Sequence, residues 1–215
     1  MYCLNPDELN FPDPMWYHPP QGLIAAGGDL SPERLWLAYS HGIFPWYNPD
    51  EEILWWCPDP RFVLFPGDVK ISKSMRKIFR DEVFIFTENQ CFEQVMRSCA
   101  EAPRSGQDGT WISEELIDSF KILHDIGIAK SFEAWRDGEL VGGFYGLAIG
   151  KVFCGESMFS KESNASKAVF LNFVAKQREF EIIDCQIHSQ HLESLGAGMI
   201  SKQAFLSYLP AYGSA

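Results

Sequence analysis

The segment Val152–Ser160 constrains the fold most, because it combines strand-forming residues with a single acidic side chain, Glu156. Side chains alternate across a strand, so Cys154, Glu156 and Met158 are predicted to share one face. Burying a carboxylate costs on the order of several kcal/mol unless a donor or a cation meets it. The acid therefore either caps a neighbouring loop or belongs to a functional site, and this segment alone leaves both interpretations open.

A second apolar segment, Ile182–Ile187, also carries polar side chains where a core strand would have none. The same period of two places Asp184 and Gln186 together on one face, with Ile183 on the opposite face. Two predicted strands thus each place polar groups in apolar surroundings, which favours a functional site over a loop cap.

The chain of 215 residues can form one large domain, or a core of about 150 residues with a small appendage. We expect no signal peptide and no membrane span, since no apolar run approaches the required length of about 18 residues. The six cysteines show no CxxC spacing, which indicates reduced thiols in the cytosol rather than zinc ligands or disulfides. The chain also shows no metal-ligand spacing and no P-loop.

The net charge of −11 argues against a nucleic-acid partner, but the charge is unevenly distributed. Residues 61–80 hold six basic residues and one acid, and a helix is predicted over Ser72–Arg80. Its bases recur at helical spacing on one face, at Lys73, Arg76, Lys77 and Arg80. A solvated face usually mixes both signs, so this pattern favours contact with a phosphate backbone.

The remaining pattern predicts an α+β fold, with a small N-terminal α/β module over residues 1–62 and a larger domain over residues 63–215. Residues 1–30 are expected to form an irregular arm, residues 43–47 an aromatic loop and residues 101–110 a mobile loop. Three antiparallel strands between 131 and 160, a helix from about 164 to 180 and the strand at 182 follow the order of a GNAT-like acyltransferase domain. Four of the seven tryptophans lie between positions 36 and 56, either as core residues or as a stacking platform for an aromatic ligand.

Several ordered motifs together closely resemble the bacterial leucyl/phenylalanyl-tRNA protein transferases. The resemblance covers nearly the whole chain and rests on Gly27–Ser31, Gly42–Trp46, Leu54–Arg61, Gly109–Ile112, Phe153–Ser160, Asn164–Lys167 and Ile183–Gln186. It implies a cytoplasmic enzyme, expected to be a monomer, that moves Leu or Phe, and less readily Met, from aminoacyl-tRNA to the N-terminal Arg or Lys of a protein. That transfer would mark the acceptor for degradation, and the resemblance implies that it uses neither a metal nor a coenzyme.

The resemblance also implies roles for individual residues. Asp184 and Gln186 would form a catalytic relay, in which Gln186 contacts the attacking amine and Asp184 polarises it or accepts its proton. Glu156 would orient polar groups of the substrate. The aminoacyl pocket maps onto Phe144, Phe153, Met158, Phe173 and Ile183, and the residues expected to place the terminal adenosine are Tyr39, Trp46 and Trp111. Strict alternation puts Phe153 opposite Met158, so a shared pocket requires a bulge, for which Gly155 is the candidate.

The sequence is also compatible in part with two other functions. A coenzyme A dependent N-acyltransferase needs a pyrophosphate-binding loop on a helix N-terminus, but the best candidate, Glu193–Gly198, begins with an acid. A non-catalytic receptor for basic protein N-termini would use the acidic surface of the chain instead. Peptide-bond formation from charged tRNA separates the transferase from the receptor.

Overall fold

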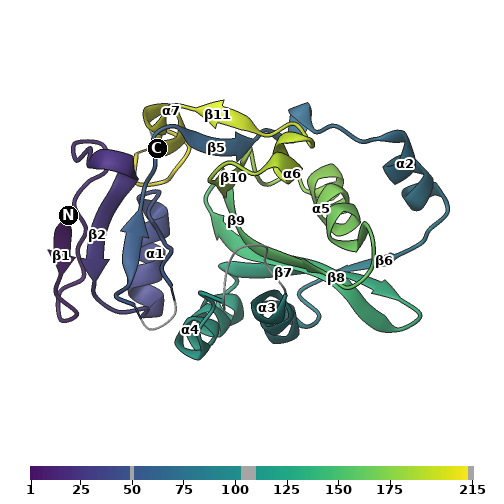
Figure 1. The fold of residues 1–215 in the computed structure, drawn as a ribbon, viewed down its shortest axis with the longest axis horizontal. Coiled ribbons are helices and arrows are strands. Elements are labelled where there is room, and N and C mark those ends of the chain that lie inside the picture. Colours follow the sequence, from purple (N-terminus) through teal and green to yellow (C-terminus); the bar gives the residue numbers. More distant parts are fainter. Residues whose placement is uncertain (49–50, 103–109, 213–215) are drawn as a thin grey trace.

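The computed structural model describes residues 1–48, 51–102 and 110–212, which form two β-sheets with helices packed against them (Figure 1). The smaller sheet has the strand order β1-β2-β4-β3, and β1 pairs with β2 in parallel. Helix α1 (Pro32–Ser40) packs beside it. The strands of this sheet are β1 (Tyr2–Leu4), β2 (Leu23–Gly27), β3 (Phe44–Pro45) and β4 (Leu54–Trp56), with a 3₁₀ turn over Pro20–Gly22.

The larger sheet has seven strands in the order β11-β5-β10-β9-β8-β7-β6. Strands β6 to β9 are antiparallel neighbours, and helix α5 then leads to β10, which lies parallel to β9. The strands are β5 (Arg61–Leu64), β6 (Ile85–Glu88), β7 (Ala129–Arg136), β8 (Glu139–Ile149), β9 (Val152–Ser160), β10 (Ile182–Gln186) and β11 (Gly198–Ile200). This arrangement confirms the predicted α+β class and the strand order predicted for a GNAT-like domain.

Four of the helices begin directly after a serine that caps their first turn. The side chains of Ser31, Ser72, Ser113 and Ser201 each accept a hydrogen bond from a backbone amide in the first turn, which satisfies a donor that the helix itself leaves free. The helices that follow β5 are α2 (Lys73–Arg80), α3 (Phe92–Glu101), α4 (Glu114–Asp125), α5 (Ala165–Lys176), α6 (Gln190–Glu193) and α7 (Lys202–Leu206), with a 3₁₀ turn over Pro66–Asp68. Within the described residues, no helix is long and apolar enough to cross a membrane.

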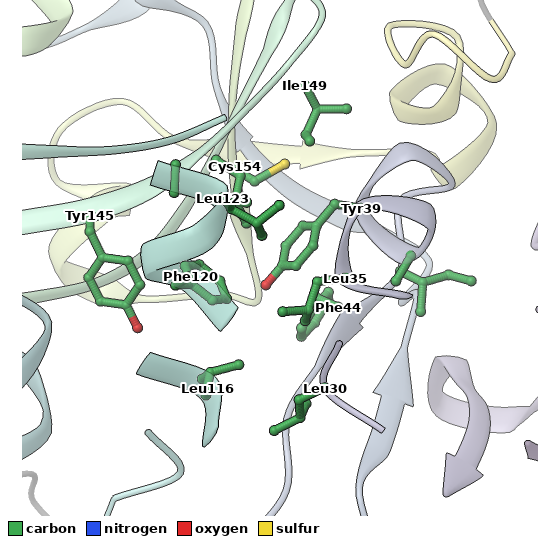
Figure 2. Packing of buried hydrophobic residues seen from close by; sticks show 14 of the residues in the cluster. Leu30, Leu35, Tyr39, Phe44, Leu116, Phe120, Leu123, Tyr145, Ile149 and Cys154 are labelled. Atoms are coloured by element: carbon green, nitrogen blue, oxygen red, sulfur yellow. The ribbon is translucent and has the colours of Figure 1, made fainter. Parts of the chain in front are cut away.

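Helices cover both faces of the larger sheet. Helix α5, with α2 beside it, covers one face over a cluster rich in phenylalanine, whereas α3 and α4 cover the other (Figure 1). The core on the α3 and α4 side continues to α1 and β3 (Figure 2): Leu35 and Tyr39 of α1 and Phe44 of β3 lie in the same buried cluster as Leu116 and Phe120 of α4. Strand β5 also crosses the predicted boundary between residues 62 and 63. The division into two domains therefore stays a prediction.

Three local predictions were wrong. Residues 1–30 are not wholly irregular, because β1 and β2 pair there, and Phe44–Pro45 of the expected aromatic loop pairs with β4. Helix α5 ends at Lys176 rather than near Phe180, since Gln177 has extended backbone angles. Residues 103–109 of the expected mobile loop lie outside the described residues.

Candidate active site

The site forms where the parallel strands β9 and β10 stop pairing. Their register runs from Val152 with Ile182 to Cys154 with Asp184, and the residues that follow on each strand are no longer paired with each other. Each strand is also irregular at this point. The side chains that follow can therefore meet across a gap in the sheet instead of pointing above and below it.

The irregularity in β9 is a bulge at Glu156. Its partner strand β8 pairs Gly146 with Gly155 and Tyr145 with Ser157, so Glu156 is the extra residue. A bulge was predicted next to this position, at Gly155. It shifts the alternation by one, so that Phe153 and Met158 both pack with the cluster under α5, whereas Cys154 belongs to the core on the other face. The prediction from strict alternation that Cys154 and Met158 share a face was therefore wrong.

The irregularity in β10 lies between Asp184 and Gln186. Gln186 has a φ of 63°, in the left-handed region that residues with a Cβ seldom adopt. Its backbone amide donates a hydrogen bond of 2.9 Å to Oδ1 of Asp184. This bond satisfies the amide that the bulge frees from the sheet, and it fixes the direction of the Gln186 side chain.

Glu156 and Gln186 meet across the gap. Nε2 of Gln186 donates to Oε1 of Glu156 at 2.8 Å, and the Tyr39 hydroxyl interacts with the same carboxyl group. Burial raises the pKa of Glu156 to about 8; the negative charge of Asp184 adds to this effect, while Tyr39 and Gln186 oppose it. Glu156 is thus a carboxyl group that exchanges its proton near neutral pH.

Asp184 is committed to an ion pair with Arg61 of β5. The guanidinium donates from Nε to Oδ1 at 2.7 Å and from Nη2 to Oδ2 at 2.6 Å, and both side chains are at most 1% exposed. The rings of Phe44 and Phe205 lie 4.7 and 4.6 Å from the guanidinium carbon. Burial disfavours the charge on Arg61, but the Asp184 carboxylate outweighs this and raises the arginine pKa above its ordinary value. The guanidinium of Arg61 therefore keeps its charge and is held rigidly by Asp184.

Glu156 and Gln186 border a cavity of about 350 Å³, a volume typical of small-molecule sites. One wall is apolar and is formed by Phe144, Met158, Phe170 and Ile183. Trp46 and Trp111 also line the cavity, together with a polar stretch of the chain from Gln186 to His191.

The structure brings most of the candidate residues to this cavity, but not all. Phe144, Met158, Ile183, Trp46, Trp111, Glu156, Asp184 and Gln186 line it. Phe153 and Phe173 lie behind this apolar wall, with their ring centroids 4.8 Å apart. The Phe153 ring packs so closely on Gly146 of β8 that a Cβ at this glycine would lie 2.7 Å from it. Tyr39 is 1% exposed and does not line the cavity, because α1 holds it against the core; it contacts Glu156 from behind instead of offering a face for an adenosine.

The residues that sequence reasoning missed are Arg61, Phe44, Phe170 and Phe205. The sequence does contain an indication that Arg61 is functional, because it is a single basic residue at the start of the apolar segment 61–65. Phe44 lies in a segment whose sequence predicts a loop, and Phe170 and Phe205 have the ordinary spacing of core residues in a helix.

The four bases of α2 are all exposed and lie at the end of the molecule away from the small sheet (Figure 1). Arg80 forms a surface ion pair of 3.0 Å with Asp81. The opposite face of α2 packs through buried Met75, as the helical spacing predicted. Binding of a phosphate backbone by this face stays a prediction.

Across the residues that the structure describes, no group of three or more His, Cys, Asp or Glu side chains could hold a metal ion. The six cysteines form no disulfide, and Cys57, Cys99 and Cys154 are buried.

Comparison with known proteins identifies the family. The profile described as "Leucyl/phenylalanyl-tRNA protein transferase" matches residues 63–210, and that of its N-terminal domain matches residues 28–59. Proteins named leucyl/phenylalanyl-tRNA–protein transferase include one from Flavobacterium johnsoniae, 53% identical over 97% of this chain and 99% of its own length. Another, from Cellvibrio japonicus, is 52% identical over 96% of this chain and 88% of its own.

Among solved structures, a GCN5-related N-acetyltransferase-like protein from Streptococcus suis aligns with a TM-score of 0.38 and 14% identity, over 74% of this chain and 60% of that one. A similarity this low does not bear on the activity. The two family profiles and the full-length relatives show that the chain belongs to the leucyl/phenylalanyl-tRNA–protein transferase family and is an aminoacyltransferase that moves an aminoacyl group from tRNA to protein.

Proposed function

We propose that this protein transfers Leu or Phe, and less readily Met, from aminoacyl-tRNA to the N-terminal Arg or Lys of acceptor proteins, and so marks them for degradation. The reaction would take place in the cytoplasm, where charged tRNA is found. The observation that carries the proposal is the pair Glu156 and Gln186, joined at 2.8 Å beside the apolar wall of the cavity. The pair supplies polar groups for an amine, and the wall supplies a place for an aliphatic or aromatic side chain.

The aminoacyl side chain would lie against Phe144, Met158 and Ile183, and the terminal adenosine against Trp46 and Trp111. These aromatic rings can stack on a base, which is worth about 1 to 3 kcal/mol for each base. The exposed bases of α2 would bind phosphates of the tRNA body. The acceptor would then enter beside Gln186 with its free amine.

The chemistry requires little beyond orientation and movement of a proton, because an aminoacyl ester is already activated. A protein N-terminal amine has a pKa of about 7.7 to 8.0, so a minority of it is neutral at pH 7. The side-chain oxygen of Gln186 would accept a hydrogen bond from that amine. The nitrogen attacks the ester carbonyl carbon, the bond from that carbon to the ribose oxygen breaks, the departing ribose oxygen takes up a proton to become a hydroxyl, and the nitrogen loses a proton.

We assign the acceptance of this proton to ionised Glu156 and not to Asp184. A general base works best when its pKa lies near the working pH, and that of Glu156 is about 8. Asp184 already accepts three hydrogen bonds, two from Arg61 and one from the amide of Gln186. Asp184 would therefore position Gln186, which replaces the relay expected from the resemblance.

Family membership favours this function over both alternatives weighed from the sequence. A receptor would bind basic N-termini without forming a peptide bond, and a coenzyme A dependent enzyme would use a different donor.

The direct test is incubation with labelled Leu-tRNA and a peptide that begins with Arg. We expect label on the peptide amine, and none on the same peptide after N-terminal acetylation. A peptide that begins with Asp is the control for acceptor choice. Binding of the Arg peptide without transfer would support the receptor and refute the proposal.

A further inference from the structure

A second cavity of about 420 Å³ lies between β6, β7 and the end of α5. It is separate from the cavity that holds Glu156 and Gln186. Phenylalanine rings line much of it, at Phe86, Phe132, Phe173 and Phe180, and its charged residues include Lys130 and Glu179. Lys130 forms ion pairs with Glu88 at 3.5 Å and with Glu179 at 3.3 Å.

A partition of aromatic rings separates the two cavities. Phe144 lines the first cavity and Phe132 lines the second, and the two residues are direct cross-strand partners on β8 and β7. Their rings are stacked, with centroids 4.9 Å apart and an angle of 18° between the planes. Phe173 braces both, at 4.5 Å from Phe132 and 5.4 Å from Phe144. The second cavity therefore lies behind the apolar wall of the first, with the rings of Phe144 and Phe132 between them.

This stacking holds Phe144 in place. Phe144 is 2% exposed and Phe132 behind it is 7% exposed. Because both are closely packed, an acyl side chain in contact with Phe144 cannot displace its ring. Without the Phe132 ring, Phe144 could turn towards the second cavity and the two volumes would join.

We propose that Phe132, which does not itself line the first cavity, sets the depth of the aminoacyl pocket and thereby excludes bicyclic side chains such as that of tryptophan. The inference rests on the proposed function, since it assumes that the first cavity holds the aminoacyl side chain. Phe132 acts through Phe144 and is a positioning residue for substrate choice. A monocyclic or aliphatic side chain fits above the partition, whereas an indole ring needs the space below it.

The test compares Leu and Trp carried on the same adenosine, so that the donors differ in the side chain alone. Transfer to an Arg peptide is measured for the wild type, Phe132→Ala and the control Phe180→Ala. Phe180 is also 7% exposed and lines the second cavity, but it packs on Phe153 and Phe173 at 5.3 and 6.1 Å, away from the stacked pair. We expect the ratio of Trp to Leu transfer to rise about 10-fold or more in Phe132→Ala, the usual range for an apolar pocket, and to stay unchanged in Phe180→Ala.

Two further measurements keep the test decisive. Phe132→Leu removes less volume, so if Phe132→Ala does not fold, the Leu variant should show a smaller rise in the same ratio. Binding of non-reactive amide analogues of Leu- and Trp-adenosine reports the preference without the transfer step. A wild type that binds the analogues but transfers nothing would reject the proposed function alone. A folded variant at position 132 with the wild-type ratio in binding and transfer, or an equal rise in Phe180→Ala, would overturn the partition.

Discussion

Replacing Asp184 by Asn should destabilise the protein strongly, because Asp184 is a structural anchor in this site. Asn has nearly the same shape, but its amide group would point a donor at Nη2 of Arg61, where Oδ2 of Asp184 now accepts at 2.6 Å. The variant also leaves the positive charge of Arg61 buried without its partner. Both effects act on groups that are at most 1% exposed, where water cannot compensate.

The expected loss is about 3 to 5 kcal/mol in the free energy of unfolding, the usual cost of removing one member of a buried ion pair. Much of this cost comes from the unpaired guanidinium. The double variant Arg61→Met and Asp184→Asn should therefore lose less than the sum of the two single variants. Phe44 and Phe205 would then pack on an apolar chain instead of a cation.

Urea unfolding, followed by tryptophan fluorescence and by circular dichroism, gives the free energies. The matched control is Asp29→Asn. Arg34 is also 1% exposed and pairs with Asp29 at 3.0 Å, but its Nη2 keeps bonds to the carbonyl oxygens of Asn5 and Pro6. The control should lose less stability than Asp184→Asn and should keep transfer activity. An Asp184→Asn variant as stable as the wild type but inactive would refute the assignment, because the carboxylate would then take part in the chemistry.

Three further predictions concern the donor, the acyl group and stability. Changing Lys73 and Lys77, or Arg76 and Arg80, to Glu should weaken full-length Leu-tRNA and reduce the salt dependence of binding while sparing Leu-adenosine; equal loss on both donors would place α2 in folding instead. Phe144→Ala should relax rejection of Ile, a preference worth about 1 to 3 kcal/mol, more than it slows Leu; an unchanged ratio of Leu to Ile transfer, with both rates reduced, would refute this. Since burial raises the pKa of Glu156 to about 8, the folded state holds a proton that the unfolded chain loses near pH 4.5, so its stability falls as pH rises between these values. Urea unfolding of Glu156→Gln against pH should therefore lack this fall, and a fall equal to that of the wild type would contradict the shift.

The sequence was informative about the site because polar residues in apolar strands are rare and costly. Glu156, Asp184 and Gln186 could be selected on that ground, and the basic face of α2 could be read from helical spacing. The strand β2 was not predicted because the prolines and aromatic residues that precede it, between residues 11 and 20, suggest an irregular chain.

The exact geometry of the site could not be read from the sequence. A bulge moves every following side chain to the other face, and neither bulge leaves a local pattern that fixes its position. Arg61 and Asp184 are 123 residues apart, so a sequence pattern cannot pair them. The hydrogen bonds from Arg61 are the ground for our proposal that Asp184 positions Gln186, whereas the relay expected from the resemblance stays a prediction.

The pH dependence of the transfer rate tests the central claim, that Glu156 accepts the proton from the attacking amine. The rate at low concentrations of an Arg peptide and Leu-adenosine is measured from below pH 7 upward, for the wild type, Glu156→Gln and the control Glu181→Gln, an exposed acid that pairs with Lys151. Well below pH 7, both the amine and Glu156 must lose a proton before the reaction can occur. The base-10 logarithm of the rate should therefore decrease by about two for each unit that the pH is lowered in the wild type and in the control, and by about one in Glu156→Gln. A slope of about one in the wild type would contradict the claim, because the proton acceptor would then be a group other than Glu156.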